Sequence, residues 1–210
     1  MALRDKETED INIEEDTDKG KEKASSDVNK SILKDFIEMS IYLLLVLVGA
    51  YLFVTFVAQR SVVDGDSMYP TLHDGDNMIC EKISYRFGEP ERFDIVVFPN
   101  EASHAYFIKR VIGLPGETVQ IKDGFVYING ERLEENYGYE VILDGGRAKE
   151  PVTLGEDEYF VMGDNRNNST DSRSEMVGNV KKEQLFGHIV FRVYPFNKMG
   201  GLKSINEKAE

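Results

Sequence analysis

The sequence predicts a mainly β fold, in which a β-rich domain follows one N-terminal transmembrane helix. Residues 39–58 form an apolar stretch that contains no charged side chain. Beyond residue 60 the chain breaks into short runs of β-branched and aromatic residues separated by turn residues. No long amphipathic helical pattern interrupts these runs. The 210 residues, 41% of them hydrophobic, suffice for one domain with its own core and some extensions.

The segment before the apolar stretch is acidic. Residues 1–38 hold 12 Asp/Glu and 7 Lys/Arg, with few large apolar side chains before Ile32. Such a segment cannot bury enough apolar surface to offset its chain entropy, so we expect a disordered cytoplasmic tail. An acidic docking segment is the alternative. The net charge of -13 and the lack of a dense Lys/Arg run argue against a nucleic-acid partner.

Residues 39–58 predict a membrane anchor. As a helix, these 20 positions reach about 30 Å, the thickness of a bilayer's hydrocarbon core. A cleaved signal peptide is the competing interpretation, but the long acidic leader favours a retained anchor. Five lysines lie between residues 19 and 34, whereas only Arg60 follows the stretch before Lys82. The positive-inside rule then predicts a single-pass protein of the cell membrane, with a cytoplasmic N-terminus and residues 61–210 on the outer face.

The exported part is expected to contain seven strand-forming runs. We predict strands within residues 77–87, 94–98, 105–113, 118–130, 139–143, 158–162 and 185–195. Asp123-Gly124 separates two alternating runs and predicts a hairpin, because both turn residues tolerate positive φ. We assign residues 61–195 to this domain and residues 196–210 to a flexible C-terminal tail.

The chain offers few metal ligands. Cys80 is the only cysteine, so no internal disulfide can form, and we expect it to pack as a small apolar residue. His73, His104 and His188 are scattered and lack the paired spacing of a metal site. We therefore expect no metal and no other cofactor.

Ser67, in the stretch "GDSMYPTL" of residues 65–72, is a candidate nucleophile. A serine hydroxyl attacks well only when a neighbouring base removes its proton. The letters "GDS" resemble the opening of the GDSL-type esterases, in which a D-x-x-H block supplies that base. This sequence lacks such a block. The structural alternative is a turn serine ahead of Pro70.

Lys109, in "YFIKRVIG", is a better candidate base than any of the three histidines. In a strand, Phe107, Lys109 and Val111 share one face. Burial among apolar groups lowers the pKa of a lysine and makes its amine a usable base near neutral pH, which a guanidinium cannot be. We expect Arg110 on the outer face. The alternative is that the Lys109 side chain extends from a strand edge into water.

The polar run "GDNRNNSTDSR", residues 163–173, directly follows the predicted strand 158–162. Its composition predicts a loop ordered by side-chain to backbone hydrogen bonds. Ser169 could orient a neutral lysine amine without adding charge, and Asp171 could pair with Arg173 two residues later. A plain surface turn, with overlapping N-x-S/T sequons at Asn167 and Asn168, is the alternative.

Taken together, these segments resemble the type I signal peptidases of bacteria, which are membrane-anchored serine proteases. The match runs in order through the anchor, "GDSMYPTL", "RFDIVVF", "YFIKRVIGLPGE" and "GDNRNNSTDSR", and ends near Val193. The compact size and single anchor look like the Gram-positive form, with a small remnant of a second domain expected within residues 131–157. The resemblance implies removal of N-terminal signal peptides from exported preproteins after Ala-x-Ala type sites, in the membrane beside the secretion translocon.

The resemblance also implies residue roles. Ser67 would be the nucleophile, Lys109 its general base, and Ser169 the residue that orients the lysine amine. Asp171 and Arg173 would brace the loop, and Asp164 and Arg166 would do similar work. The residues implied to line the pockets for small substrate side chains are Val63, Met68, Leu72, Phe107 and Ile108.

The sequence departs from the family's pattern at several positions. Gly65 stands where some members have a serine whose hydroxyl helps to bind the oxyanion. The oxyanion hole would then rest on backbone N–H groups, chiefly that of Ser67, unless another donor enters. Asn167 replaces a frequent Asp, and Phe93 a frequent Gly. A membrane-tethered β-domain that binds peptides without cleaving them is an alternative of another class, which the intact catalytic residues disfavour.

Overall fold

The computed structural model describes residues 30–55, 57–100, 103–138 and 140–202. The chain divides into two compact units, residues 1–52 and 53–210. Most of the predicted acidic tail, residues 1–29, lies outside the described residues, and so does the end of the predicted C-terminal tail, residues 203–210.

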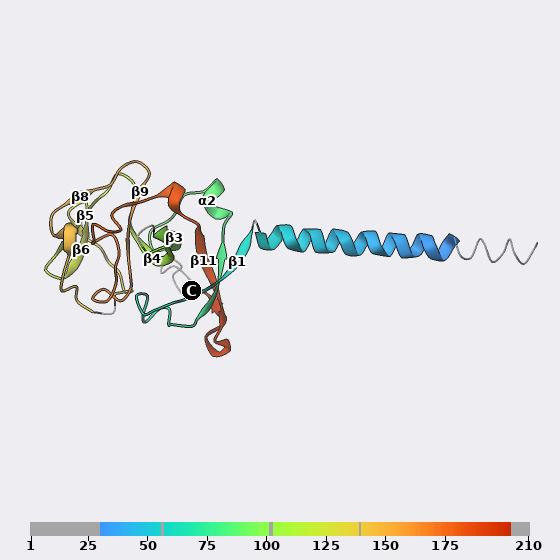
Figure 1. Ribbon diagram of the computed structural model, residues 1–210. Coiled ribbons are helices and arrows are strands. Elements are labelled where there is room, and N and C mark those ends of the chain that lie inside the picture. Colours follow the sequence, from blue (N-terminus) through green and yellow to red (C-terminus); the bar gives the residue numbers. More distant parts are fainter. Residues whose placement is uncertain (1–29, 56, 101–102, 139, 203–210) are drawn as a thin grey trace, which may run out of the picture. The chain divides into compact units, whose positions relative to one another are not determined.

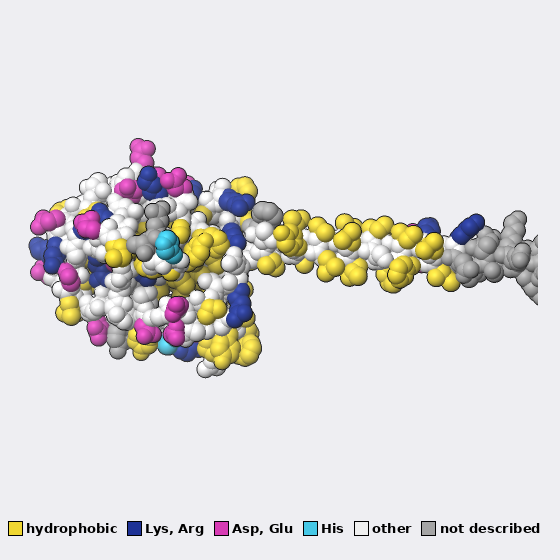
Figure 2. All heavy atoms as spheres, in the orientation of Figure 1, with side chains coloured by type: hydrophobic (Ala, Val, Ile, Leu, Met, Phe, Trp, Pro, Cys, Tyr) yellow, Lys and Arg dark blue, Asp and Glu magenta, His cyan; other side chains and the backbone are white. Residues whose placement is uncertain are grey.

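An apolar helix runs from Lys30 to Thr55 and is long and apolar enough to cross a membrane (Figure 1). The helix begins before the predicted span of residues 39–58 and ends before the span does. Its C-terminal end is earlier because Ala58 already begins a strand. The earlier start fits the local sequence, in which Lys34 and Glu38 form an i,i+4 ion pair at 3.6 Å. Apolar side chains cover the surface of this helix, whereas charged side chains of both signs are spread over the β-rich unit (Figure 2).

Among the described residues, the larger of two antiparallel sheets carries eight strands in the order β1-β2-β11-β3-β4-β9-β10, with β12 beside β11. These strands are β1 (Ala58–Val62), β2 (Asn77–Glu81), β3 (Ile95–Asn100), β4 (Ala105–Gly113), β9 (Glu158–Met162), β10 (Val180–Lys181), β11 (Gly187–Tyr194) and β12 (Gly200–Gly201). β12 pairs with β11, so the first part of the predicted flexible tail is ordered.

The smaller sheet has the order β7-β6-β5-β8. Its strands are β5 (Thr118–Lys122), β6 (Phe125–Ile128), β7 (Glu131–Arg132) and β8 (Val152–Thr153). Asp123 and Gly124, with φ of 52° and 80°, form the turn between β5 and β6, which confirms the predicted hairpin. The remaining elements are α2 (Ser84–Phe87) and the 3-10 helices η1 (Gly146–Lys149), η2 (Lys182–Gln184) and η3 (Phe196–Lys198).

Most predicted strands are present, with two kinds of difference. The run 77–87 divides into β2 and the one-turn helix α2. The predicted strand 139–143 is wrong over the described residues 140–143, where Val141 and Leu143 are 57% and 83% exposed. This segment is held by the Asn167 side chain, which donates to Val141 O at 3.0 Å and accepts from Leu143 N at 3.0 Å.

One buried cluster anchors the segment that follows β1. It contains Val63, Met68, Leu72 and Cys80, all at most 4% exposed, packed with side chains from β2, β3 and β11. Cys80 therefore packs as an apolar residue, as predicted. Full burial of a side chain such as that of Met68 or Leu72 stabilises the fold by about 1.5–3 kcal/mol.

Candidate active site

Ser67 lies on a turn between β1 and β2. Tyr69 N donates to Asp66 O at 3.1 Å, and Leu72 N donates to Met68 O at 2.9 Å. The side chains of Met68 and Leu72 point into the core and are 1% and 0% exposed. The buried side chains of Met68 and Leu72 thus hold the turn against the core, while Ser67 itself stays half-buried at the surface.

Lys109 reaches Ser67 from the middle of β4. Its Nζ donates to Ser67 Oγ at 2.7 Å and to Ile108 O at 2.9 Å. The Phe107 ring lies 5.1 Å from the same nitrogen. Lys109 is 4% exposed, so the alternative of a side chain extended into water is wrong.

Burial lowers the pKa of Lys109 from its ordinary value of 10.5 to about 8. Asp171 and Asp164 act in the opposite direction and raise it. Each of these carboxylates has its own arginine, since Asp171 pairs with Arg173 and Asp164 with Arg110. Their charges are therefore largely compensated, and burial determines the direction of the shift.

Arg110 is buried, and the expectation that it lies on an outer face is wrong. It is 2% exposed and binds Asp164 through two hydrogen bonds, Nε to Oδ1 at 2.8 Å and Nη2 to Oδ2 at 2.6 Å. Strand alternation does turn Arg110 away from Lys109, but this second face is also covered. The Tyr137 ring lies 3.6 Å from the guanidinium carbon, and Phe93 O accepts from Nη1 at 2.8 Å.

Phe93 adopts a φ of 77°, in the region that favours glycine. Its ring is 7% exposed and packs 5.1 Å from the Tyr137 ring. Burial of the ring offsets the cost of the backbone conformation at this position.

Asp164 also connects the loop 163–173 to the Ser67 turn. Its Oδ2 accepts from Thr71 Oγ1 at 2.5 Å. Thr71 O in turn accepts from Arg192 Nη2, on β11. Neither Thr71 nor Arg192 was singled out from the sequence, because their partners are distant along the chain and no local motif marks them.

The expected pairing of Asp171 with Arg173 is confirmed. Nε and Nη2 of Arg173 each donate to one Asp171 oxygen at 2.8 Å. Gly163 N donates to Asp171 Oδ2 at 3.0 Å. Burial raises the pKa of Asp171, but the hydrogen bonds and charge of Arg173 outweigh this effect and leave the pKa below its ordinary value.

Asp164 and Arg166 do not pair with each other through their side chains. Asp164 binds Arg110, whereas Arg166 binds Glu135 through two hydrogen bonds of 2.5 and 2.6 Å. Glu135 belongs to the segment 131–157, so Arg166 attaches the loop to that segment. Both residues brace the loop, but with partners that lie far away in the sequence.

Ser169 lies beside the Ser67 turn and makes no hydrogen bond to the lysine amine. Its Oγ is buried and makes no hydrogen bond of standard geometry with any described residue, although it lies near enough to Asp171 to help lower that residue's pKa. A Cβ on Gly163 would lie 2.3 Å from Ser169 Oγ and 2.4 Å from Ser67 O. Only glycine at position 163 permits this close packing.

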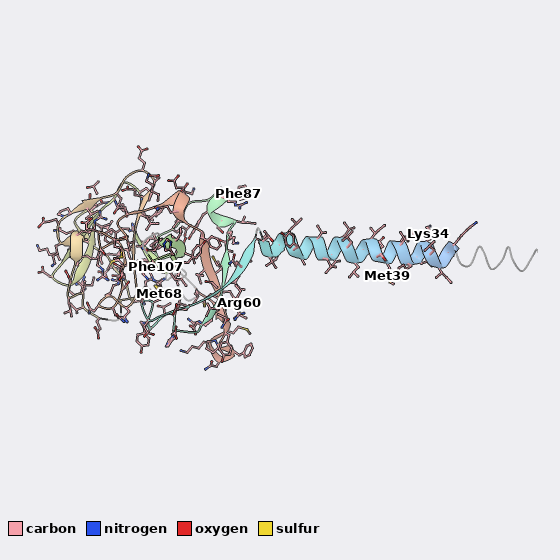
Figure 3. All side chains as sticks on the ribbon, viewed as in Figure 1. Lys34, Met39, Arg60, Met68, Phe87 and Phe107 are labelled. Atoms are coloured by element: carbon pink, nitrogen blue, oxygen red, sulfur yellow. The ribbon has the colours of Figure 1, made fainter. Side chains whose placement is uncertain are left out.

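A cavity of about 320 Å³ contains Ser67 and Lys109. Met68 and Phe107, labelled in Figure 3, both line it. Other predicted site residues in its wall are Val63, Gly65 and Ile108, and residues not predicted for it include Tyr106, Asn168 and Thr170. Leu72 is not part of the wall, because it is fully buried in the core.

A larger hollow, of about 810 Å³, is lined by Tyr85 and Phe186 and contains neither Ser67 nor Lys109. Within the described ranges, no group of three or more His, Cys, Asp or Glu side chains could hold a metal ion.

Comparison with known proteins identifies the family. The family model for signal peptidase, peptidase S26, matches residues 33–194. The chain is 46% identical over 156 residues to a signal peptidase I of Leptolyngbya laminosa, covering 70% of this chain and 74% of the relative. It is 40% identical over 182 residues to signal peptidase I S of Bacillus subtilis, covering 81% and 96%. It is also 44% identical over 160 residues to a probable signal peptidase I-2 of Synechocystis, covering 73% and 71%. The chain therefore belongs to the signal peptidase family, peptidase S26, and is a type I signal peptidase, an enzyme that removes signal peptides.

Proposed function

We propose that this signal peptidase cleaves with a Ser67–Lys109 dyad after Ala-x-Ala type sites. The observation that carries the proposal is the 2.7 Å contact between Lys109 Nζ and Ser67 Oγ in a buried environment. The lowered pKa of Lys109, about 8, supports it, because an appreciable fraction of the amine is then neutral near neutral pH.

The proposed reaction proceeds through an ester. Ser67 Oγ forms a bond to the scissile carbonyl carbon while its proton moves to neutral Lys109 Nζ. The tetrahedral intermediate collapses with cleavage of the C–N bond, and the Lys109 ammonium gives the proton to the leaving amine. A water molecule then attacks the ester, Lys109 accepts a proton from it, and Ser67 Oγ leaves and regains a proton. Atoms balance, and the amine is neutral again at the end.

The Ser67 backbone N–H is the proposed donor to the oxyanion. It donates no hydrogen bond to any residue that the structure describes, and Ser67 lines the cavity. Gly65 N, by contrast, is engaged with Asp74 Oδ1 at 2.9 Å. A free N–H aimed at the developing negative charge stabilises the transition state more than the ground state.

The walls of the cavity support a preference for small side chains. The half-buried side chains of Phe107 and Ile108 present apolar surface next to the dyad, and Val63 and Met68 close the wall behind them. A volume of about 320 Å³ must hold several substrate residues, which leaves little room for large side chains before the scissile bond. Small, apolar residues such as alanine fit this description.

The N-terminal helix supports a membrane site of action. We propose that it is an anchor, with the N-terminus cytoplasmic and the β-rich unit on the outer face, because the lysines precede the apolar stretch. Attachment to the bilayer through which preproteins are exported, beside the translocon, raises the effective concentration of their signal peptides.

The test is cleavage of a preprotein with an Ala-x-Ala site by the full-length protein in detergent, with sequencing of the new N-terminus. We expect cleavage after the last alanine by the parent, and none by Ser67→Ala or Lys109→Ala. Ser84→Ala and Lys122→Ala, at exposed positions outside the cavity, are the matched controls and should retain activity. Cleavage by either dyad variant would reject the dyad. Binding without cleavage by the parent would favour the peptide-binding domain.

A further inference from the structure

Asn165 contacts both peptide units that flank Ser67. Its backbone N donates to Ser67 O at 3.0 Å, and its side-chain Nδ2 donates to Asp66 O at 3.1 Å. A carbonyl oxygen can only accept, so the amide nitrogen of Asn165 must face Asp66 O. One residue of the loop 163–173 thus holds the nucleophile from both sides.

The hydrogen bond to Asp66 O also determines where the Ser67 N–H points. Asp66 C=O and Ser67 N–H belong to the same planar peptide unit, which is trans, so the N–H points away from the carbonyl. Any rotation of this unit moves both groups together. Holding Asp66 O therefore holds the direction of the Ser67 N–H.

The chain before Ser67 does not fix this direction by itself. Gly65 adopts a φ of 86°, and a Cβ there would meet no atom within 4 Å. Gly65 N donates to Asp74 Oδ1 at 2.9 Å, which holds the peptide unit before Gly65 and not the one between Asp66 and Ser67. Asp66 O accepts a second hydrogen bond from Tyr69 N at 3.1 Å, but that bond lies within the turn and moves with it. The hydrogen bond from Asn165 connects the peptide unit between Asp66 and Ser67 to the loop 163–173, which other contacts hold in place.

We propose that Asn165 is a positioning residue that aims the Ser67 N–H at the oxyanion during the reaction. The inference rests on the proposed function, because it assumes that Ser67 attacks and that its N–H stabilises the resulting charge. The hydrogen bonds of Asn165 go to Ser67 O and Asp66 O and not to Lys109 or Ser67 Oγ, so its effect is expected on the orientation of the donor.

Asn167 provides a matched comparison in the same loop. Its side chain makes three hydrogen bonds, to Glu140 Oε2, Val141 O and Leu143 N, all away from the Ser67 turn. Asn167→Ala removes more hydrogen bonds from the loop than Asn165→Ala does, but none that touches residues 66 and 67. A difference between the two variants therefore reports on orientation and not on general loosening of the loop.

The experiment measures kcat and KM of full-length Asn165→Ala on a peptide with an Ala-x-Ala site. Loss of a whole oxyanion donor costs about 100- to 1,000-fold in kcat, so a misaimed donor should cost about 10- to 100-fold. We expect KM to stay within about 2-fold and the pH midpoint of kcat/KM to stay unchanged, because the lysine keeps its surroundings. Affinity for a peptide aldehyde, which forms a tetrahedral adduct with serine, should fall in parallel with kcat.

Asn165→Asp is the second variant, assayed at pH 9 where its carboxylate is ionised. It keeps the size and the backbone contact to Ser67 O, but an oxygen then faces Asp66 O and repels it. We expect a loss of kcat at least as large as in Asn165→Ala. Asn167→Ala should stay within about 3-fold of the parent.

Three results would overturn the inference: unchanged kcat in Asn165→Asp, an effect on KM alone, or an equal loss of kcat in Asn167→Ala. Failure of the proposed function is distinguishable, since in that case Ser67→Ala would cleave as the parent does. If Ser67→Ala is inactive and Asn165→Asp is fully active, only the positioning role is rejected.

Discussion

Replacing Lys109 by methionine removes a group that is costly to bury in its charged form. Methionine has a similar length and no charge, so it fills the same space between Phe107 and Ser67. Below pH 8 the folded parent must carry an ammonium group that is 4% exposed. We therefore expect Lys109→Met to be inactive and yet more stable than the parent in this range.

The magnitude follows from the two pKa values of the lysine. The difference between 10.5 in the unfolded chain and about 8 in the folded protein corresponds to about 3 kcal/mol of unfolding free energy. Loss of the hydrogen bonds to Ser67 Oγ and Ile108 O returns about 1–2 kcal/mol. The net stabilisation of the variant below pH 8 should thus be about 1–2 kcal/mol.

The dependence on pH is sharper than the net value, because the hydrogen-bond contribution cancels from it. Between pH 8 and 10.5 the unfolded lysine binds a proton that the folded lysine does not, so the stability of the parent rises with pH. In Lys109→Met this rise is absent. The advantage of the variant should therefore shrink by about 3 kcal/mol from pH 7 to above pH 10.5.

The assay is urea unfolding of the full-length proteins in detergent at a series of pH values. Unfolding is monitored by circular dichroism and tyrosine fluorescence. Lys122→Met, at an exposed position of β5, is the control and should show no such dependence. A stability difference between Lys109→Met and the parent that does not change from pH 7 to 10.5 would refute the reasoning, because the lysine would then not be buried at a cost.

Three further predictions concern the same site. The kcat/KM of the parent should rise with pH to a plateau with a midpoint near 8, since only the neutral amine of Lys109 can accept a proton, and a profile flat from pH 6 to 10 in a peptide assay would contradict this. Asp164→Asn leaves the Arg110 charge buried without its partner, so the unfolding free energy should fall by about 3–5 kcal/mol. A fall below about 1 kcal/mol in urea titrations would contradict the contribution of this ion pair to stability. Gly163→Ala places a Cβ 2.4 Å from Ser67 O and 2.3 Å from Ser169 Oγ, so kcat should fall at least about 10-fold, and a parental kcat would contradict the packing of the loop against the turn.

The local features of the fold could be predicted from the sequence. The alternating run of β4, the strand β9 and the Asp123-Gly124 turn depend on neighbouring residues, and each lies where the pattern indicated. The burial of Lys109 was also predictable, because alternation placed it with Phe107 and Val111. Strand periodicity and turn chemistry are properties of short segments, and they survive in the folded protein.

The distant partners could not be predicted in the same way. Arg110 was expected on an outer face because alternation reports the two sides of a strand and not whether both are covered. The pairs Arg110–Asp164 and Arg166–Glu135 depend on which segments meet in space. Asn165 was overlooked for the same reason, since its only signal in the sequence is a place in a polar loop.

The most direct test of Lys109 as the general base is a pH titration of its own amine. The titration is monitored by NMR of the full-length protein with isotopically labelled lysine side chains. The Lys109→Arg variant identifies the resonance by its disappearance. We expect this lysine to titrate near pH 8, with a midpoint that coincides with that of kcat/KM. A Lys109 amine that titrates at pH 10 or above, while activity changes near pH 8, would contradict the assignment of this lysine as the base.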